Sequence, residues 1–451
     1  MLKRVEVVVV GAGSAGCVTA HRCAEMGLKT LLLDRKPQPL VGHKVCGDEV
    51  SRSHFDATGI EYPQGEEIAN IITGADVYPP SMEQELKVRG WTEFDGWMLN
   101  RISFGQRLLK AAVSVGVSFH PNCHVNGPVV KDGKVMGVEY REPDTGGITT
   151  VAAKLVVDAS GFAGVIRSKL DDPLVEKRIA KTDIALCYRE YLRLKMPLAE
   201  PNVARVFLGA RVAPAGYAWV FPRGVSEVNA GIGTTGGESR GSPKSYFLKL
   251  KAEYPLLFGS QELEGGGGAV PVRRPLMSLV ADGVAFVGDA ALQVNPIHGG
   301  GIGPGMRAGI ILGEVAKEAI ARGDVSAEGL WDYNSRFLSD YGRRLASLEI
   351  FRRLLQDVSD DDMDFGFSRR LLEAEDLMSA NRGDAFSLGI AGKLRRVKRS
   401  SGRLGLLLKL RKAAGLMKKM NKTYLNYPAG SEGFESWVRS VNNILQSAHF
   451  E

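Results

Sequence analysis

A chain of 451 residues is longer than one hydrophobic core usually supports, so we expect two or three domains. The composition, 44% hydrophobic and 24% charged, is that of an ordinary globular protein, and no run of eighteen apolar residues is present to span a membrane. The net charge of +7 arises from one region near the C-terminus, since residues 385–431 contain no acid and twelve Lys or Arg.

The five cysteines are odd in number, lack the spacing of a metal site and end at Cys187. This pattern is typical of reduced thiols, so we expect neither a disulfide framework nor a bound metal. Residues 1–4 lead directly into the first predicted strand and leave no room for a signal peptide. We therefore expect a cytoplasmic protein.

The first 35 residues predict a strand, a glycine turn, a helix and a second strand. Residues 5–10 are a β-branched run typical of a strand buried on both faces. Residues 11–16 form a complete G-x-G-x-x-G, whose glycines permit a tight turn, the approach of a pyrophosphate and close packing of the next helix. That helix, about 14–26, directs its positive end at the pyrophosphate. The strand 29–33 ends at Asp34, where a carboxylate accepts hydrogen bonds from a ribose. Together these features predict a dinucleotide-binding unit.

Between residues 35 and 161 the pattern of strands and helices continues, with one excursion. We predict a polar helix from the run 44–48 through residue 53, and a longer helix from about residue 100 to 116. Further strands are predicted at residues 117–119, 125–130, 134–140 and 154–157. Short strands with turns over residues 74–94 indicate an excursion into another domain.

Residues 180–270 consist of alternating runs that predict a broad antiparallel sheet, half buried, with strands at 204–208, 217–221 and 227–232. A second G-x-G-x-x-G at residues 231–236 follows a strand but precedes no helix, so we interpret it as a strand end with a loop. The chain then encodes one dinucleotide cradle. Residues 284–287 predict another buried strand, followed by a glycine-rich run and a helix to about 321 with Pro304 near its first turn.

Residues 324–451 are rich in Leu, Lys, Arg and Glu and are predicted to be helical. On a helix from Leu406, apolar residues share one face and basic residues lie mostly opposite: Leu406, Leu410, Ala413, Met417 and Met420 against Arg411, Lys412, Lys418 and Lys419. Two interpretations remain open. The helix either lies on an anionic membrane, at its cytoplasmic face, or packs within a domain by its apolar face. Nucleic acid is not expected, because no aromatic residues are interleaved with the charge.

Three separated segments resemble FAD-binding proteins of the p-hydroxybenzoate hydroxylase fold: the turn 11–16, the run 158–167 and the run 288–301. The resemblance implies an α/β fold, with a Rossmann-type FAD-binding domain, an antiparallel-sheet substrate domain and a helical C-terminal domain. It also implies that a helix N-terminus faces the flavin pyrimidine. The residues expected to bind FAD are Gly11, Gly13, Ala15, Gly16, Asp34, Arg35, Lys44, Cys46, Gly47, Arg101, Val125, Asp158, Gly161, Asp289, Pro296, Gly300, Gly301 and Ile302.

More specifically, the chain resembles the geranylgeranyl reductase family, in its archaeal digeranylgeranylglycerophospholipid reductase branch. The resemblance rests on K-V-C-G-D at 44–48, Y-A-W-V-F-P at 217–222, P-V-R-R-P at 271–275 and the runs 295–301 and 424–428. It implies FAD-dependent saturation of C=C bonds in the geranylgeranyl chains of archaeal lipid precursors, either a digeranylgeranylglycerophospholipid or geranylgeranyl diphosphate. Hydride transfer from the flavin must be accompanied by protonation of the other carbon, and a dry, aromatic-walled channel tolerates the developing positive charge.

Several side chains are candidates for this chemistry. Tyr217, Trp219 and Phe221 alternate, so they face one side of a strand and are expected to line the isoprenoid channel; plain sheet core is the alternative. We expect Cys46 to position substrate or relay a proton, against the alternative of an inert thiol. The candidate catalytic residues are Cys46, Tyr217 and Trp219, and the candidate substrate-binding residues are Tyr217, Trp219, Phe221, Pro222, His298 and Arg273.

Arg273, with Arg274, would pair either with a lipid phosphate or with solvent at a strand end. Two other functions remain open: a flavin monooxygenase that hydroxylates an aromatic substrate, and a non-enzymatic carrier of prenyl chains. The external electron donor is expected to be NAD(P)H or a ferredoxin-like protein. The expected domains are FAD-binding at 1–75, 98–172 and 275–325, substrate-binding at 76–97 and 173–274, and helical at 326–451.

Overall fold

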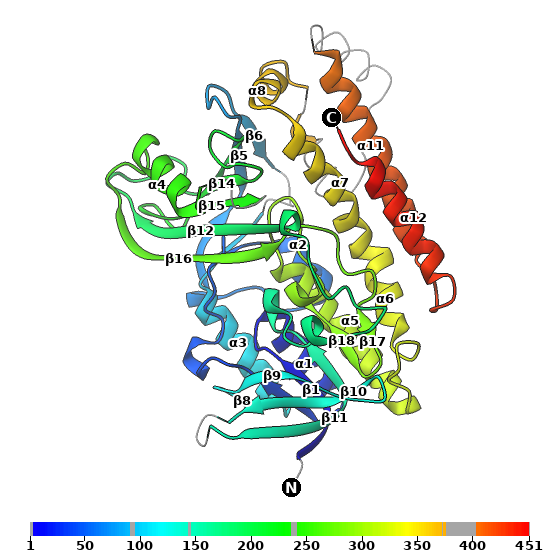
Figure 1. Ribbon diagram of the computed structural model, residues 1–451. Helices are drawn as coiled ribbons and strands as arrows, with labels where there is room; N and C mark the ends of the chain where they lie inside the picture. Colours follow the sequence, from blue (N-terminus) through cyan, green and yellow to red (C-terminus); the bar gives the residue numbers. More distant parts are fainter. Residues whose placement is uncertain are drawn as a thin grey trace.

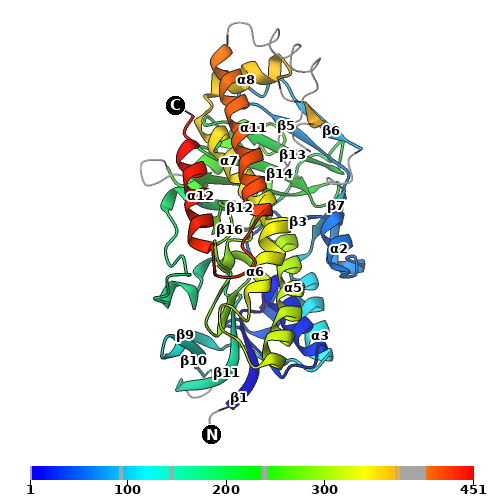
Figure 2. The same ribbon diagram turned by 90° about the vertical axis from the view of Figure 1, so that its right-hand side faces the viewer.

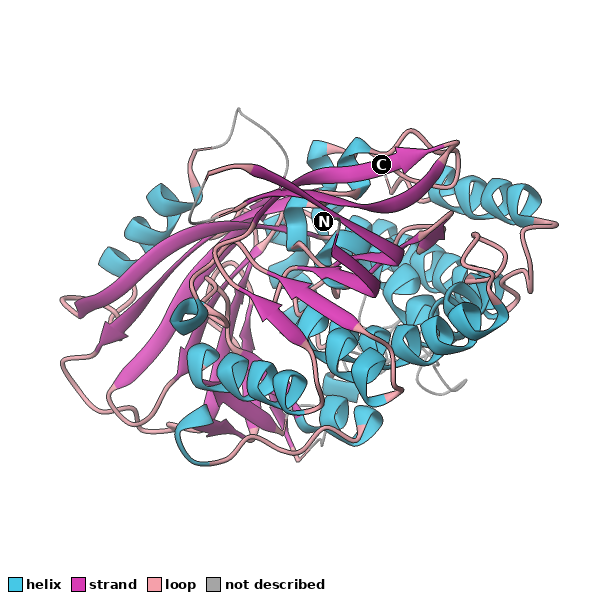
Figure 3. Ribbon diagram, turned by 90° about the horizontal axis from the view of Figure 1, so that it is seen from below, coloured by secondary structure: helices cyan, strands magenta, loops and turns pink. Residues whose placement is uncertain are grey.

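The structure is a computed structural model that describes residues 3–90, 95–142, 146–235, 241–371, 373–375 and 403–450. Two large sheets lie one above the other, and the long C-terminal helices, coloured yellow to red, run beside the upper one (Figure 1). Seen from below, the strands run across the upper and left parts of the view, and most helices gather to the right and below them (Figure 3).

The first sheet has a parallel core that contains the N-terminal strand. Its order is β17 (Val280–Ala281), β18 (Val284–Phe286), β11 (Ile148–Asp158), β1 (Lys3–Val10), β2 (Thr30–Leu33) and β8 (Ser118–His120), with β9 (His124–Lys131) and β10 (Lys134–Arg141) attached through β11. Val7, Val8, Val9 and Val10 of β1 are buried, as a strand covered on both faces requires. Helices α1 (Ser14–Glu25), α3 (Arg101–Ser114) and α5 (Ile302–Arg322) pack beside it.

The second sheet is antiparallel except at one pair. Its order is β16 (Gln261–Pro271), β12 (Ile184–Arg193), β15 (Glu227–Thr235), β14 (Tyr217–Pro222), β13 (Val203–Leu208), β5 (Gly74–Tyr78) and β6 (Leu86–Arg89). Helix α4 (Pro243–Glu253) covers one face with Phe247 and Leu250. Strand β5 pairs in parallel with β13, so the excursion at residues 74–94 does join a distant part of the chain. Residues 91–94 lie outside the described residues.

A third, small sheet corrects one prediction. Residues 49–51 form strand β3 (Glu49–Ser51), which pairs with β7 (Gly96–Leu99), itself paired with β4 (Ile68–Ile72). The predicted polar helix therefore begins only at Arg52, as α2 (Arg52–Thr58), with the Ser51 side chain accepting a hydrogen bond from the Ser53 N–H. A distant strand decided the structure here, because β7 supplies hydrogen-bond partners that local sequence does not reveal.

The C-terminal part is helical, as predicted. It contains α6 (Trp331–Phe337), the π-helical η8 (Leu338–Gly342), α7 (Arg343–Asp357), α8 (Asp360–Ser368), α11 (Leu404–Leu425) and α12 (Phe434–Ser447). Helices α7 and α11 lie side by side, and α12 packs on α11 (Figure 2). The buried face of α11 consists of Leu406, Ala413, Met417, Met420 and Tyr424, so the interpretation of a packed domain helix is the one observed. No helix in the described ranges is long and apolar enough to cross a membrane.

Candidate active site

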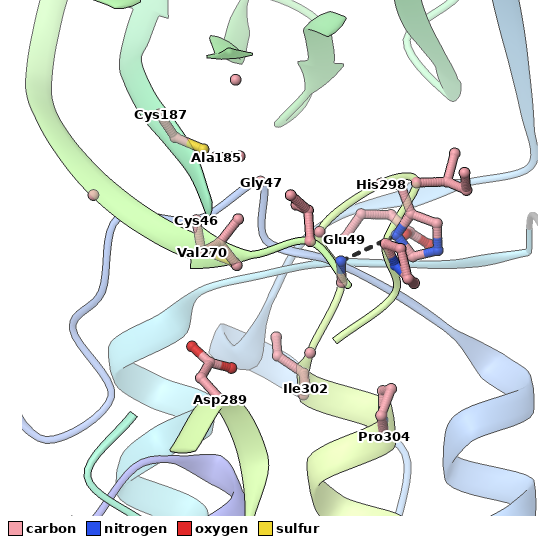
Figure 4. Close-up of a pocket in the computed structure, with 18 of the residues that line it drawn as sticks. Cys46, Gly47, Glu49, Ala185, Cys187, Val270, Asp289, His298, Ile302 and Pro304 are labelled. Atoms are coloured by element: carbon pink, nitrogen blue, oxygen red, sulfur yellow. Dashed lines mark hydrogen bonds between the residues drawn. The ribbon is translucent and has the colours of Figure 1, made fainter. Parts of the chain in front are cut away.

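A cavity of about 1270 Å³ runs between the two large sheets and along α7. Cys46 and Cys187 lie on one side of it and His298 on the other, with Asp289 and Ile302 beneath (Figure 4). Its walls come from segments that are far apart in the sequence, namely the turn 11–16, the loop 41–49, strands β14 and β16, the loop 296–301 and helix α7.

The glycine turn forms one end of this cavity. Gly11 has φ +107°, and a Cβ on it would lie 2.4 Å from the carbonyl oxygen of Ala159, so only glycine fits. A Cβ on Gly16 would lie 1.9 Å from the Gly11 carbonyl oxygen, which explains the close packing of α1 on the strand. Gly13 faces open space and caps α1 without a side-chain hydrogen bond, so the first N–H groups of the helix are left for an anionic ligand.

Charged groups surround the same end. Asp34 accepts hydrogen bonds from the N–H groups of Ala12 (2.6 Å) and Lys36 (2.7 Å), which orients its carboxylate. Arg101 is 8% exposed, lines the cavity and leaves Nε and Nη1 without a hydrogen-bond partner in the described structure. A buried guanidinium without partners is costly unless a ligand pairs with it. Lys44 and Asp289 form an ion pair of 2.6 Å, and the carboxylate raises the pKa of Lys44.

The N-terminus of α5 faces the cavity from below. The loop before it is shaped by its own hydrogen bonds: Asn295 Oδ1 accepts from the Ile297 N–H, and His298 Nδ1 accepts from the Gly300 N–H. Gly301 caps α5 without a side-chain hydrogen bond. The positive end of the helix dipole is therefore available to an electron-rich ring. These features fit FAD. The N-termini of α1 and α5 face the cavity without side-chain caps, Arg101 lacks partners for two of its nitrogens, and the turn 11–16 leaves room for a pyrophosphate.

The aromatic row of β14 faces the cavity. Tyr217, Trp219 and Phe221 line it, with ring centroids 5.7 Å and 6.2 Å apart in succession. The Tyr217 hydroxyl donates to the His298 carbonyl oxygen (2.6 Å), and burial raises the pKa of Tyr217, so the phenol stays protonated. The alternation predicted from the sequence is confirmed, and the three rings form an apolar wall.

Gly231 makes room for the central ring of this row. It lies opposite Trp219 in the strand pair β14–β15, and a Cβ there would lie 2.3 Å from Trp219 Cζ2. The second G-x-G-x-x-G is thus a strand that seats an indole, with Gly231 and Gly233 inside β15. The interpretation that it is no second cradle holds for these two glycines, and Gly236 lies outside the described residues.

A buried hydrogen-bond network joins the aromatic row to the loop 44–48. Asn229 Oδ1 accepts from Trp219 Nε1 (3.0 Å), and its Nδ2 donates to the Cys46 carbonyl oxygen and to Asp48 Oδ2, both at 2.8 Å. The Tyr191 hydroxyl also donates to Asp48 Oδ2 (2.6 Å). Asp48 has φ +66°, a strained conformation for a non-glycine residue. These bonds fix the position of Cys46 relative to Trp219.

Two further ionisable side chains line the cavity near Cys46. Burial raises the pKa of Glu49 to about 7 and that of Cys187 to about 12. Cys187 is therefore an inert thiol. Glu49 holds a proton over part of the physiological pH range, which gives this end of the cavity a titratable carboxyl group.

Most of the predicted site residues meet here, and three do not. Asp158 is fully buried outside the cavity, where its carboxylate accepts hydrogen bonds from the N–H groups of Ser160, Ile166 and Arg167; it shapes the loop that carries Gly161. Pro222 follows Phe221 and so points to the opposite face of β14. The remaining predicted FAD-site residues, with His298, all line the cavity.

Arg273 is the third predicted site residue that does not line the cavity. It and Arg274 are each 6% exposed and pair with Glu176, while Arg274 also faces Glu349. Neither the lipid-phosphate role nor the solvated pair is observed, because both guanidinium groups are compensated inside the protein. The basic charge near the cavity comes from other residues.

Several residues of the cavity were not predicted. Glu49 follows the predicted motif 44–48, but only the folded chain shows that it lines the cavity. Asn229 is fully buried behind the lining, where it holds the loop 44–48 against Trp219. Others follow a helical spacing that the sequence does display, along η8 and α7: Tyr341, Arg344, Leu348, Phe351 and Leu355. Which face of α7 would meet the cavity was not readable from that spacing. In the described ranges, no group of His, Cys, Asp and Glu is placed to hold a metal ion.

Family models match two parts of the chain. The FAD dependent oxidoreductase model matches residues 6–168, and the geranylgeranyl reductase catalytic domain model matches residues 183–270. The chain is 38% identical over 442 residues to the digeranylgeranylglycerophospholipid reductase of Sulfolobus acidocaldarius, covering 98% of this chain and 97% of that protein. It is 32% identical over 392 residues to digeranylgeranylglycerophospholipid reductase 2 of Methanopyrus kandleri, covering 84% and 93%.

Solved structures agree. A geranylgeranyl bacteriochlorophyll reductase-like protein from Thermoplasma acidophilum superposes with a TM-score of 0.76 at 26% identity, over 92% of this chain and 100% of that chain. The myxobacterial FAD-dependent halogenase CndH has a TM-score of 0.65 at 16% identity, over 99% of this chain and 97% of that chain, a likeness that concerns the fold alone. The p-hydroxybenzoate hydroxylase-like architecture expected from the sequence is confirmed.

Proposed function

This chain belongs to the digeranylgeranylglycerophospholipid reductase family, and we infer from that premise that it saturates C=C bonds of geranylgeranyl chains in archaeal membrane lipid precursors. It is an FAD-dependent oxidoreductase acting on CH–CH groups. One observation carries the inference at the level of the site: the glycine cradle and the aromatic row of β14 open into the same cavity. A monooxygenase and a carrier of prenyl chains, which the sequence left open, are set aside by the family.

FAD, when bound in reduced form, supplies the hydride for this reaction. We propose that the turn 11–16, Asp34 and Arg101 hold its nucleotide half, while Lys44, Asp289 and the α5 N-terminus hold its other half. Tyr217, Trp219 and Phe221 would exclude water from the prenyl chain and face the positive charge that develops on it. The remaining residues of the proposed FAD site all line the cavity: Arg35, Cys46, Gly47, Val125, Gly161, Pro296, Gly300 and Ile302.

We propose that Cys46 Sγ positions the alkene or passes a proton to it. The Asn229 amide holds the Cys46 backbone beside Trp219, which supports a defined place for this thiol. Cys46→Ser replaces the thiol by a hydroxyl of similar size and is expected to lower kcat more than it raises KM, whereas Cys187→Ser serves as the control. Trp219→Ala is expected to raise KM for the prenyl substrate. Full turnover by both site variants would remove these residues from the mechanism.

The reaction class is tested by following substrate and oxygen together. The purified, FAD-loaded protein is supplied with digeranylgeranylglyceryl phosphate or geranylgeranyl diphosphate, with electrons from NADPH or from a reduced ferredoxin. A reductase yields products that gain two hydrogen atoms per bond, without oxygen uptake linked to substrate. Products that carry an added oxygen atom would contradict the inference. The comparison of NADPH with reduced ferredoxin also identifies the electron source, which is expected to be one of the two.

We also propose that the protein collects its substrate at an anionic membrane surface. The apolar face of α11 is occupied by α7, so contact would use the exposed Leu404 and Leu408 together with the basic residues of the helix. Sedimentation with vesicles containing anionic lipid, but not with neutral vesicles, is the expected result. Recovery of all protein in the supernatant with both would contradict it.

We propose the domain division stated above: residues 1–75, 98–172 and 275–325 for FAD, 76–97 and 173–274 for substrate, and 326–451 as the helical part. Sheet membership supports it, because β5 and β6 belong to the antiparallel sheet while β1, β11 and β18 belong to the parallel one.

A further inference from the structure

The cavity changes character along α7. Among the cavity residues of η8 and α7, five recur at intervals of three and four and so share one face over about 21 Å: Tyr341, Arg344, Leu348, Phe351 and Leu355. Arg352, Leu354 and Gln356 of α7 also line the cavity, and the Arg352 guanidinium is paired with Asp183. At the η8 end this face carries Tyr341 and Arg344, and towards the other end it carries Leu348, Phe351 and Leu355. The apolar lining then continues over α8 and α11 with Met363, Phe367, Leu371, Leu406 and Leu410.

The η8 end is a cationic mouth, formed by Arg307 of α5 and Arg344 of α7. Both guanidinium carbons lie 5.6 Å from the centre of the Tyr341 ring, so they flank the same side chain. The neighbouring α2 residues Ser53 and Ala57 line the cavity and are exposed, which opens this end to solvent.

The charge at this mouth is only partly compensated. Arg307 pairs with Asp340, whereas no carboxylate of the described residues pairs with Arg344, whose Nε is buried and lacks a hydrogen-bond partner. His54 packs 6.0 Å from the Tyr341 ring, and burial, together with His298, Arg307 and Arg344, lowers its pKa to about 4. The histidine is therefore neutral, and the mouth keeps an excess of positive charge from the two arginines.

We propose that Arg307 and Arg344 bind the phosphate or diphosphate end of the prenyl substrate, while its chain runs along α7 towards α8 and α11. The assignment rests on the proposed function, since only a substrate with a charged end and a long apolar chain matches both ends. Apolar burial favours the chain at the Leu and Phe end, and paired N–H donors favour a phosphate at the arginine end.

The test measures binding of phytanyl phosphate, the saturated C20 ester, and of phytanol to the FAD-loaded protein by calorimetry. Arg344→Gln and Arg307→Gln are each expected to weaken phytanyl phosphate binding tenfold or more and to leave phytanol binding unchanged. In turnover assays, both variants are expected to have a higher KM for geranylgeranyl diphosphate and a kcat within twofold of that of the unmodified protein. Arg343→Gln is the matched control, because Arg343 is adjacent in sequence, lies outside the cavity lining and donates to Asn421.

Equal loss of phytanol and phytanyl phosphate binding, or no loss of either, would overturn the assignment. Displacement of phytanyl phosphate by inorganic phosphate at equal concentration would also overturn it, because it would indicate a general anion site. A failure of the proposed function would be seen differently. The unmodified protein would then reduce no geranylgeranyl substrate, and this result does not depend on what the arginine variants bind.

Discussion

Gly231 and Trp219 illustrate how single residues set the shape of this site. The indole lies where any side chain on Gly231 would lie, and Asn229 holds the indole nitrogen on the same strand. Gly231, which resembled part of a nucleotide-binding motif, thus leaves the space that the Trp219 ring occupies. The nearest atoms decide its role, rather than the spacing of glycines.

Gly231→Ala is expected to destabilise the protein by about 1–3 kcal/mol, because the added methyl group overpacks against Trp219 and Arg189. Chemical denaturation measures the free energy of unfolding. Gly268→Ala on β16 is the control, since its Cβ would meet nothing within 4 Å and the free energy should change by less than about 0.5 kcal/mol. Equal stability of the Gly231→Ala variant would show that Trp219 is not held where the structure has it.

Glu49 gives a pH dependence at the same scale. Its folded-state pKa is raised to about 7 from an ordinary 4.5, so its contribution to stability is complete below pH 4.5 and is lost as the pH rises through 7. Glu49→Gln removes this loss. When the pH is raised from 4.5 to 8, the free energy of unfolding of the parent should therefore fall by about 2–3 kcal/mol more than that of the variant. A difference in unfolding free energy between variant and parent that is independent of pH would contradict the raised pKa of the Glu49 carboxyl group.

At the scale of elements, buried ion pairs tie α7 to the strand end at Arg274. Glu349 of α7 is fully buried; burial alone would raise its pKa, but Arg274 and Arg353 lower it to about 2. Arg352 pairs with Asp183 next to β12. Helix α7, which lines part of the cavity, is therefore fixed to the antiparallel sheet by charge as well as by packing.

Glu349→Gln should cost about 3–5 kcal/mol of unfolding free energy, because a buried ion network loses a carboxylate: Arg353 loses its carboxylate partner and Arg274 keeps only Glu176. Glu318→Gln is the control: its pair with Arg322 is exposed on both sides and should contribute less than about 1 kcal/mol. The difference is measured by denaturation above pH 5, since the contribution of Glu349 is present above its unfolded pKa and declines as the pH falls towards 2. Equal losses of unfolding free energy in the two variants would show that the buried ion pairs do not stabilise the packing of α7.

The sequence was enough to predict those elements whose structure depends on neighbouring residues. The valine run, the glycine turn and the following helix were placed within a residue or two, because burial, turn geometry and helix periodicity are all written into consecutive residues. The alternation of Tyr217, Trp219 and Phe221 likewise placed three rings on one side. What failed depended on distant partners: β3 needed β7, and Arg273 needed Glu176.

The whole molecule brings two chemistries into one cavity. The parallel sheet presents helix N-termini and a glycine turn at the ends of its strands, and the antiparallel sheet presents an aromatic face. Helix α7 closes the space between them and, by its change from arginine to apolar residues, gives it a direction. The C-terminal helices act as a brace for α7, since α11 covers its outer side.

The central claim is that electrons of the bound flavin enter the prenyl chain, and anaerobic single-turnover mixing tests it most directly. The FAD-loaded protein is reduced, freed of excess reductant and mixed with digeranylgeranylglyceryl phosphate while flavin absorbance is followed. We predict that the oxidised flavin spectrum returns without oxygen, with one C=C bond saturated per flavin in the recovered lipid. A flavin that stays reduced until oxygen is admitted, or protein that binds no flavin, would contradict the account.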